Sequence, residues 1–361
     1  MVKGLVANGQ KVTSLTARPI TVRTHPNRIW WKRKEEMIDG VKYVYIPFIN
    51  NPILKFFGYK VYSFFFTILW ILKNKGEKAM VCDVLNAHAS ASMKACRLFG
   101  VKCAGIVTDI PGYMGFSNKK KSFIKRLTQN RAIRNIKRMT HLVPLTDAMC
   151  DIINPERKTP YIVVEGLVDS SMEEQTPIVV NDGKRHLTYT GSLHEVFGVK
   201  SLIEGFMMLR QDDVILDIYG RGPMKDEMDS YMAKDPRVQY HGVVSLEESV
   251  KAQLSSYLLI NPRPTGEEFT KYSFPSKNME YMATGVPLLT TVLPGMPKEY
   301  HPYVFLLEDE SAKGICKRLD EILSMPEEKL QERGQMGKDF VLKNKNNIRQ
   351  AERVIKMISK F

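Results

Sequence analysis

The feature that most constrains the fold is an alternation, repeated along all 361 residues, of short apolar runs with amphipathic stretches. Turn-forming residues bound the apolar runs, a pattern typical of parallel βα units. We predict strands at residues 12–15, 41–46, 80–85, 102–108, 141–144 and 161–164, and then at 187–189, 214–219, 238–241, 258–261, 287–290 and 304–307. The sequence therefore predicts an α/β fold with two doubly wound domains, each with about six strands.

A polar stretch near the middle of the chain, with Pro and Gly but little periodicity, sets the domain boundary. We expect an N-terminal Rossmann-like domain over residues 1–169, a linker over 170–186, and a C-terminal Rossmann-like domain over 187–342. Residues 343–361 predict a final helix with Ile348, Ala351, Ile355 and Ile358 on one face, for which packing back on the N-terminal domain is one arrangement.

The start of the chain differs from a typical dinucleotide-binding domain, which opens with a strand in the middle of its sheet. Residues 1–8 resemble the end of the helix that follows such a strand, and Gly9 then leads into the strand at residues 12–15. We expect that the chain begins after its first strand. The alternative is a variant fold that has no such strand.

The charge is distributed unevenly. The net charge is +14, but residues 1–169 carry +17 and the remaining residues −3. This asymmetry predicts a polyanionic partner for the first half, either an anionic membrane surface or nucleic acid.

Five cysteines without metal-ligand spacing predict a reduced, cytoplasmic protein without structural zinc. The N-terminus lacks the apolar stretch of a secretory signal. The aromatic-rich uncharged run at residues 61–72 has 12 residues. Because a spanning helix needs about 18 or more, we expect a protein that touches a membrane without crossing it.

The most informative segment is residues 274–287, Phe-Pro-Ser-Lys-Asn-Met-Glu-Tyr-Met-Ala-Thr-Gly-Val-Pro. Ser276 and Lys277 lie at the start of a predicted helix, where free N–H groups and the positive end of the helix attract phosphate. Glu280 follows one turn later, and its carboxylate can accept two hydrogen bonds from a ribose diol. The alternative is a helix whose methionines pack on the sheet while Glu280 is solvated.

This segment resembles the nucleotide-sugar motif of family-4 glycosyltransferases, which are retaining enzymes with a GT-B fold. Further matches to the family lie ahead of this segment, in the family's order, at Tyr189-Thr-Gly-Ser, Phe197-Gly, Tyr219-Gly-Arg-Gly-Pro, His241-Gly and Asn261-Pro-Arg. The resemblance covers essentially the whole chain and is closest to bacterial transferases that build capsular or exopolysaccharide repeat units. It implies two Rossmann-like domains and transfer of a sugar, with retention, from a nucleotide-diphosphate donor to a lipid-linked glycan.

Carried over by position, Glu280 contacts the donor ribose, whereas the place of the family's other glutamate is taken by Tyr272. Glu267 or Glu268 could substitute for it. No cofactor beyond the nucleotide sugar is implied, and no metal, because no Asp-x-Asp follows an apolar strand. The residues that the resemblance assigns to the donor are Gly191, Ser192, Gly220, Arg221, Gly222, His241, Gly242, Arg263, Phe274, Ser276, Lys277 and Glu280.

Several of these assignments have plainer alternatives. The family's Arg and Lys beside Gly191 are absent, so neutralisation of the diphosphate falls to Lys277, Arg221 or Arg263. Glycines at the end of a strand allow close approach to a ligand, but any tight strand-to-helix turn also favours glycine. His241 lies where members of the family contact the nucleobase, although a lone histidine more often has a structural role.

In the first half, Asp109 follows a predicted strand at the sheet edge where α/β folds bind ligands. It is a candidate to orient or deprotonate an acceptor hydroxyl, and the alternative is an Asx turn before Pro111. His88 matches a histidine common in the family. The predicted catalytic residues are thus Asp109, His88, Lys277 and Arg221.

A basic segment follows, with nine cations and no acidic residue among residues 119–138. It suits anionic lipid heads or a lipid diphosphate, and a solvated helix face is the alternative. The aromatic residues between Phe56 and Trp70 predict either an interfacial helix or a core helix. The residues assigned to the acceptor and membrane are Lys119, Lys120, Lys121, Lys125 and Arg126.

The leading hypothesis is therefore a cytoplasmic glycosyltransferase, peripheral on the inner face of the cell membrane, that acts in surface polysaccharide synthesis beside partner glycosyltransferases. A second hypothesis is a non-catalytic nucleotide- or glycan-binding accessory subunit of the same fold. A third, a nucleic-acid binder, rests only on the basic first half, because nothing resembles a base-reading module. We expect no nucleic-acid partner.

Overall fold

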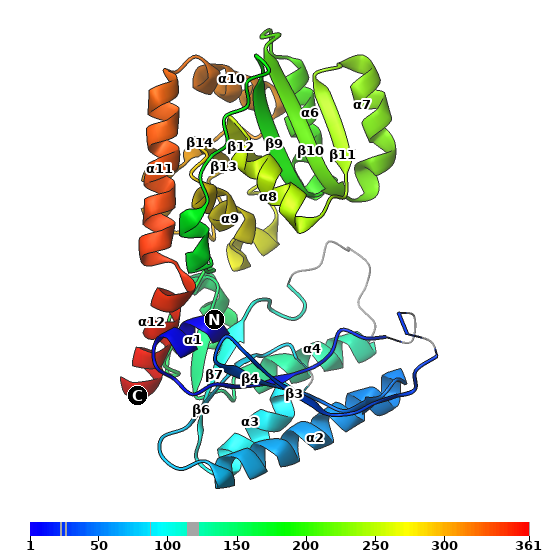
Figure 1. The fold of residues 1–361 in the computed structure, drawn as a ribbon, viewed down its shortest axis with the longest axis vertical. Helices are drawn as coiled ribbons and strands as arrows, with labels where there is room; N and C mark the ends of the chain where they lie inside the picture. Colours follow the sequence, from blue (N-terminus) through cyan, green and yellow to red (C-terminus); the bar gives the residue numbers. More distant parts are fainter. Residues whose placement is uncertain (22–23, 26, 87, 114–122, 361) are drawn as a thin grey trace. The chain divides into compact units, whose positions relative to one another are not determined.

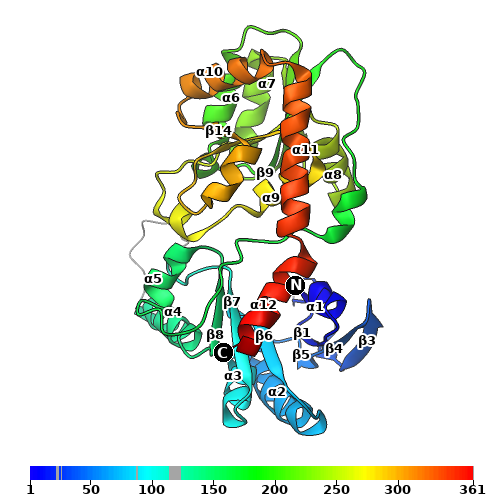
Figure 2. The same ribbon diagram turned by 90° about the vertical axis from the view of Figure 1, so that its left-hand side faces the viewer.

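A computed structural model describes residues 1–21, 24–25, 27–86, 88–113 and 123–360. The chain forms two compact units (Figures 1 and 2). Unit 1 comprises Met1–Glu165 together with Asn347–Phe361, and unit 2 comprises Gly166–Asn346.

Unit 2 is built on one six-stranded parallel sheet, seen with its strands side by side in Figure 1. The strand order is β11-β10-β9-β12-β13-β14. All six predicted strands of this half are present, as β9 (Arg185–Ser192), β10 (Val214–Arg221), β11 (Val238–Gly242), β12 (Leu258–Asn261), β13 (Leu288–Thr291) and β14 (Phe305–Leu307). The doubly wound fold predicted for this half is confirmed.

Helices cover both faces of this sheet, because α6 to α9 lie in the crossovers between its parallel strands and α10 and α11 follow the last strand. They are α6 (Val199–Met207), α7 (Met228–Lys234), α8 (Leu246–Leu254), α9 (Ser276–Thr284), α10 (Ala312–Leu323) and α11 (Glu327–Asn344). One core packs α6 and α10 against β9 and β10, with Phe206 and Ile315 buried in it. A second core packs Met279 and Tyr281 of α9 with Tyr300. Short 3₁₀ helices complete the unit: η2 (Ser170–Glu174), η3 (Glu195–Phe197), η4 (Pro223–Glu227), η5 (Glu268–Tyr272) and η6 (Lys298–Tyr303).

Unit 1 differs from the predicted single sheet of about six strands. Its longer strands form two separate sheets, of order β1-β4-β3, in which β3 is antiparallel to β4, and β6-β7-β8, which is parallel. Strand β2 pairs with β5 in a short antiparallel ribbon. The strands are β1 (Thr13–Thr16), β2 (Trp30–Trp31), β3 (Lys34–Ile38), β4 (Val41–Tyr45), β5 (Phe48–Ile49), β6 (Ala79–Asp83), β7 (Lys102–Val107) and β8 (His141–Pro144). The strand predicted at residues 161–164 is only a single bridge between Leu142 and Tyr161.

The helices of unit 1 are α1 (Val2–Ala7), α2 (Pro52–Lys73), α3 (Ala89–Leu98), α4 (Phe123–Ile136), α5 (Cys150–Ile153) and α12 (Asn347–Lys360), with η1 (Asp147–Met149). Figure 2 shows α12 beside α1. The two helices approach so closely that a Cβ on Gly4 would lie 2.0 Å from the Asn347 carbonyl oxygen. The buried face of α12 contains Ala351, Val354 and Met357. The predicted face was wrong at Ile348, which is 38% exposed.

The predicted linker is part of unit 2. Its η2 segment is held by Lys338 of α11, whose Nζ donates to the Glu173 carbonyl at 3.1 Å and also to the Gln175 carbonyl. The predicted final helix corresponds to α12, which begins at Asn347, because α11 extends to Asn344.

Candidate functional site

A cavity of about 600 Å³ lies in unit 2 beside the carboxyl ends of β9 and β10 and the start of α9. This is the edge at which open α/β sheets bind ligands. The structure brings six of the predicted donor-binding residues to this cavity. Its lining consists of Thr190, Gly191, Ser192, Tyr219, Gly220, Arg221, Gly222, Val243, Val244, Ser249 and Lys277.

The glycines of the cavity are required by the backbone around them. A Cβ on Gly220 would lie 1.8 Å from the Gly191 carbonyl oxygen, and its φ of +136° disfavours any other residue. A Cβ on Gly222 would lie 2.1 Å from the Leu193 carbonyl oxygen. The Tyr240 hydroxyl also donates to the Gly220 carbonyl at 2.9 Å. Close packing of the β9 and β10 ends therefore accounts for these glycines without a ligand.

Tyr281 joins α9 to the end of β9. The β9–β12 pairing ends at Thr188, and the Tyr281 hydroxyl takes over the next backbone groups on that side of the strand. It accepts from the Thr190 N–H at 2.8 Å and donates to the Thr190 carbonyl at 3.0 Å. The hydroxyl thus takes the place of the β-ladder hydrogen bonds at Thr190 and fixes α9 relative to the cavity wall.

Glu280 is held by two donors. Its Oε1 accepts from Gln253 Nε2 at 2.9 Å and from Lys277 Nζ at 3.0 Å. Gln253 is fully buried, whereas the Glu280 side chain is 29% exposed. Within the described residues no hydrogen bond engages Glu280 Oε2, which leaves that oxygen able to accept from a ligand.

Three cations were predicted to neutralise a diphosphate. Lys277 and Arg221 line the cavity, and Arg221 is exposed. Arg263 does not line it, and its guanidinium lies over the rings of Phe197 and Phe269, at 5.2 and 4.7 Å from their centroids. Burial lowers the pKa of Arg263, and among the described residues its buried Nε has no hydrogen-bond partner.

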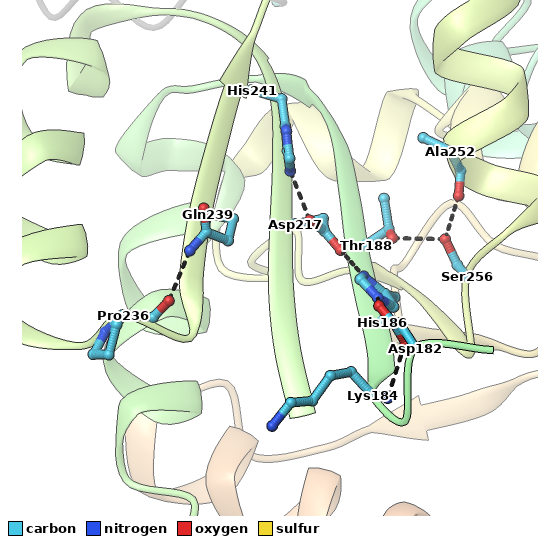
Figure 3. Close-up of polar contacts among 10 residues, drawn as sticks. All are labelled: Asp182, Lys184, His186, Thr188, Asp217, Pro236, Gln239, His241, Ala252 and Ser256. Atoms are coloured by element: carbon cyan, nitrogen blue, oxygen red, sulfur yellow. Dashed lines mark hydrogen bonds and ion pairs between the residues drawn. The ribbon is translucent and has the colours of Figure 1, made fainter. Parts of the chain in front are cut away.

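His241 contacts the cavity wall rather than the cavity, because its ring stacks on Tyr219 at 4.4 Å. Its Nε2 lies 2.6 Å from Oδ1 of the buried Asp217 (Figure 3). The other oxygen of Asp217 lies 2.6 Å from His186 Nδ1, and His186 Nε2 lies 2.9 Å from Asp182 Oδ2. Burial alone would lower the pKa of His186, but its hydrogen bonds to Asp182 and Asp217 outweigh burial and raise it.

The other predicted donor residues lie outside the cavity lining. Ser276 is the exposed first residue of α9, and Gly242 ends β11 with a φ of +71°. The Phe274 side chain is 5% exposed and packs in the core, with its ring 5.0 Å from the Tyr300 ring. Glu267 and Glu268, the suggested substitutes for a second glutamate, are exposed at the start of η5.

In unit 1, the acidic residue Asp83 links Asp109 and His88, the two catalytic residues predicted in that unit. Burial raises the pKa of Asp109, and the negative charge of Asp83 raises it further. Burial lowers the pKa of His88, whereas a hydrogen bond to the Leu15 backbone and the charge of Asp83 oppose that effect. Asp83 ends β6, so it lies at the same sheet edge as the loop after β7 that carries Asp109.

The predicted basic segment is only partly described. Lys119, Lys120 and Lys121 lie outside the described residues, and for Lys125 and Arg126 the structure describes the α4 backbone alone. Among the described residues no group of three His, Cys, Asp or Glu side chains suits a metal ion.

The surface of α2 is apolar. By length and composition this one helix of the described part is apolar enough to cross a membrane, and only 17% of its most apolar window is buried. Its buried stripe contains polar residues, Ser63 and Thr67, whereas Phe57, Phe65 and Leu69 are more than half exposed. The aromatic side chains of α2 therefore lie partly in the core and partly on the exposed side of the helix.

Sequence reasoning missed Gln253, Tyr281 and Tyr219, which orient the predicted residues. Tyr281 follows Glu280 directly in the motif, so its position was a usable signal. Gln253 lies in α8, far from the motif in sequence, and no local pattern marks it.

Comparison with known families agrees with the geometry of unit 2. Residues 184–325, which include β9, β10 and α9, match the family described as glycosyl transferases group 1. Unit 2 thus carries a glycosyltransferase group 1 domain. A comparison with curated protein sequences gives no match.

Solved structures of glycosyltransferases share the whole fold. Sucrose-phosphate synthase from Thermosynechococcus elongatus has a TM-score of 0.70 at 12% identity, covering 99% of this chain and 91% of that one. A UDP-forming α,α-trehalose-phosphate synthase from Burkholderia xenovorans has a TM-score of 0.66 at 10% identity, covering 99% and 95%. HepE from Anabaena, in complex with UDP, has a TM-score of 0.64 at 12% identity, covering 89% and 86%. The GT-B fold predicted from the motif is confirmed.

Proposed function

We propose that the protein is a retaining, metal-independent glycosyltransferase that moves a sugar from a nucleoside-diphosphate donor to a lipid-linked glycan in surface polysaccharide synthesis. The observation that carries the proposal is the cavity of unit 2, which is lined by the two cations Lys277 and Arg221 and lies within a glycosyltransferase group 1 domain. The Glu280 carboxylate is oriented by hydrogen bonds from Gln253 and from the cavity residue Lys277. HepE has been solved in complex with UDP and with UDP-glucose, which supports a uridine nucleotide as the donor.

Four residues of unit 2, Glu280, Gln253, Lys277 and Arg221, have roles in binding the donor. The Glu280 Oε2 atom accepts hydrogen bonds from the ribose hydroxyls, while Gln253 fixes the carboxylate through Oε1. The N-terminal end of α9, Lys277 and Arg221 lie where the diphosphate would bind. Their positive charge stabilises the negative charge that develops on the leaving group as the glycosidic bond breaks.

Asp109 is proposed to act on the acceptor. Since burial and the charge of Asp83 raise its pKa, the carboxylate is a stronger base than an exposed aspartate. It orients and deprotonates the acceptor hydroxyl, and His88 at the same sheet edge contributes to acceptor binding.

The unusual polarity of α2 supports a peripheral membrane location on the cytoplasmic face. Phe57, Phe65 and Leu69 form an exposed apolar stripe, as in helices that lie in the membrane interface. Burial lowers the pKa of Lys60 on the same helix, and the positive charges of Arg131 and Lys94 lower it further, so cations gather beside the stripe. Such a surface suits anionic lipid headgroups and would bring unit 1 to a lipid-linked acceptor and to partner glycosyltransferases.

The donor site is tested by the affinity for UDP. We expect Glu280→Gln to weaken UDP binding, measured by titration calorimetry, by tenfold or more. The matched control is Glu247→Gln in the first turn of α8, which should leave the affinity unchanged. Equal affinities for all three proteins would contradict the assignment of Glu280.

Membrane binding is tested with anionic vesicles. The double variant Phe65→Glu, Leu69→Glu should lose co-sedimentation with vesicles that contain phosphatidylglycerol. Leu246→Glu, which changes a residue 78% exposed on unit 2, should bind like the unaltered protein. Undiminished binding of the double variant would remove α2 from the proposal.

An accessory subunit without catalytic activity is the second candidate function. Tyr272 at the place of the family's other glutamate favours it. Turnover by the isolated chain would exclude this candidate.

A further inference from the structure

A chain of acidic and histidine side chains crosses the sheet of unit 2 beside the donor cavity, and none of them lines that cavity (Figure 3). It runs from Asp182 through His186 and Asp217 to His241, with contacts of 2.9, 2.6 and 2.6 Å. The last three residues come from β9, β10 and β11, which are neighbouring strands. Side chains therefore join these strands in addition to the backbone ladder.

The centre of the chain, Asp217, is a buried acid. Leu216 and Ile218, on either side of it in β10, are buried in the core on one face of the sheet, so Asp217 points to the other face. Asp217 is 6% exposed, and among the described residues the two histidines are its ion-pair partners. Because a buried carboxylate is unfavourable without donors, the contact between Asp217 and His241 is tightly constrained.

The donors in the chain follow from the chemistry of the carboxylates. A carboxylate only accepts hydrogen bonds, so His186 Nδ1 and His241 Nε2 both donate to Asp217. The other ring nitrogen of His186 faces Asp182, and this ring can donate at both nitrogens only as an imidazolium. Although burial lowers the pKa of His186, the two aspartates raise it overall, in agreement with that charge. The bond to Asp217 fixes the tautomer and the orientation of the His241 ring.

The His241 ring reaches the cavity through Tyr219. The two rings stack with their centroids 4.4 Å apart and their planes 12° apart, and Tyr219 lines the cavity. The ladder between β10 and β11 shifts its register between Ile218 and Tyr219, so that Tyr219 lies opposite Gly242. A shift of this kind disrupts the regular backbone hydrogen bonds. The ring stack therefore joins the two strands where their ladder is irregular.

The same end of β11 leads into a further part of the cavity wall. Val243 and Val244 line the cavity and follow Gly242, whose φ of +71° turns the chain. Val243 is 68% exposed, so burial inside unit 2 does not hold its side chain. The position of this part of the wall thus depends on the end of β11, which His241 joins to β10.

We propose that Asp217 is a positioning residue for the nucleoside-diphosphate donor. It orients the His241 ring through one hydrogen bond, and that ring in turn holds Tyr219 and the end of β11 at the cavity. The positive charge of His186 compensates the buried carboxylate. The proposal rests on the donor site of the proposed function, and it adds a role for a buried acid outside the cavity lining.

The test compares two buried aspartates of unit 2. Asp217→Leu removes both acceptor oxygens. The matched control is Asp235→Leu, because Asp235 is 8% exposed and accepts from Arg237 at 2.7 Å. Asp235 precedes β11, at the edge of the sheet opposite to the cavity.

The affinity for UDP is measured by titration calorimetry on variants that circular dichroism shows to be folded. We expect Asp217→Leu to weaken UDP binding by about tenfold, the effect of losing one oriented hydrogen bond to a charged group. Asp235→Leu should bind UDP like the unaltered protein. Equal weakening in the two variants would count against the proposal, since a general loss of stability would then explain both.

A double substitution shows whether Asp217 acts through Tyr219. In a Tyr219→Leu background, Asp217→Leu should weaken UDP binding by less than about twofold, because the wall that Asp217 positions is already altered. A purely structural role predicts the same loss of affinity in both backgrounds, and that result would overturn the proposal.

The remaining outcomes separate this role from the donor site itself. Equal UDP affinities for the unaltered protein and Asp217→Leu would exclude the positioning role and leave the donor site in place. No binding of any nucleoside diphosphate to the unaltered protein would refute the donor site, and this role with it.

If Asp217→Leu does not fold, His241→Phe takes its place. The His241 side chain is 37% exposed, and the phenylalanine keeps a ring beside Tyr219 but cannot donate to Asp217. We expect the same loss of about tenfold in UDP affinity, and an unchanged affinity would overturn the proposal.

Discussion

The hydroxyl of Tyr281 allows a sharp test of how the candidate site is built. Tyr281 is 1% exposed, and its hydroxyl pairs with both the N–H and the carbonyl of Thr190, which is 3% exposed. The substitution Tyr281→Phe removes the hydroxyl without changing the shape of the ring. It leaves two buried backbone groups of Thr190 without their partner.

The expected cost follows from these two groups. An unsatisfied buried donor or acceptor costs about 1–3 kcal/mol. Because Thr190 also lines the cavity, water can recover part of that loss. We therefore expect unit 2 to lose about 3 kcal/mol in free energy of unfolding, which for a domain of 150–250 residues lowers Tm by roughly 6–12 °C. Calorimetry gives the Tm, and hydrogen exchange at Arg185–Ser192 assigns the loss to β9.

The matched control is Tyr59→Phe in unit 1. Tyr59 is 7% exposed, and within the described residues its buried hydroxyl has no hydrogen-bond partner. The same chemical change should there leave the stability unchanged or raise it slightly. Equal effects of the two substitutions, or an unchanged Tm for Tyr281→Phe, would refute the role assigned to the Tyr281 hydroxyl.

Two further predictions concern the surroundings of the cavity. Gly220→Ala should lower the free energy of unfolding by more than about 2 kcal/mol, because of the clash with the neighbouring strand and the positive φ, whereas Gly266→Ala, with open space around it, should be neutral in urea unfolding. Since the pKa of His186 is raised on folding, its contribution to stability is complete below about pH 6.5 and declines as the pH rises through the raised pKa. Asp217→Asn should thus destabilise more at pH 6 than at pH 8.5, and equal losses of stability at both pH values in urea titrations would contradict this linkage.

The strands of this fold are readable from sequence because a parallel strand buried on both faces is a short apolar run. Runs such as Leu258–Asn261 and His141–Pro144 appear in the structure with the predicted bounds. The antiparallel strand β3, Lys34–Ile38, was missed because it is exposed and mostly charged or polar, and thus lacks an apolar run. The pairing of strands is non-local, so the division of unit 1 into two sheets could not be read from the runs themselves.

The candidate site was predictable where its residues share one local motif. Ser276, Lys277 and Glu280 lie within two turns of α9, so their spacing carried the prediction. The residues that orient them come from other elements, Gln253 from α8 and Thr190 from β9, and only the fold brings them together. Phe274 lies inside the same motif, but its side chain packs in the core.

The central claim is that this chain transfers sugar from a nucleotide donor, and turnover tests it most directly. The full chain is incubated with UDP-glucose and other nucleotide sugars, together with lipid-linked saccharides in anionic vesicles, and the release of nucleoside diphosphate and the glycosylated lipid are measured. We predict diphosphate release with one donor, a product that retains the anomeric configuration, and loss of both in Glu280→Gln. A chain that binds the nucleotide but releases no diphosphate from any donor would contradict the claim.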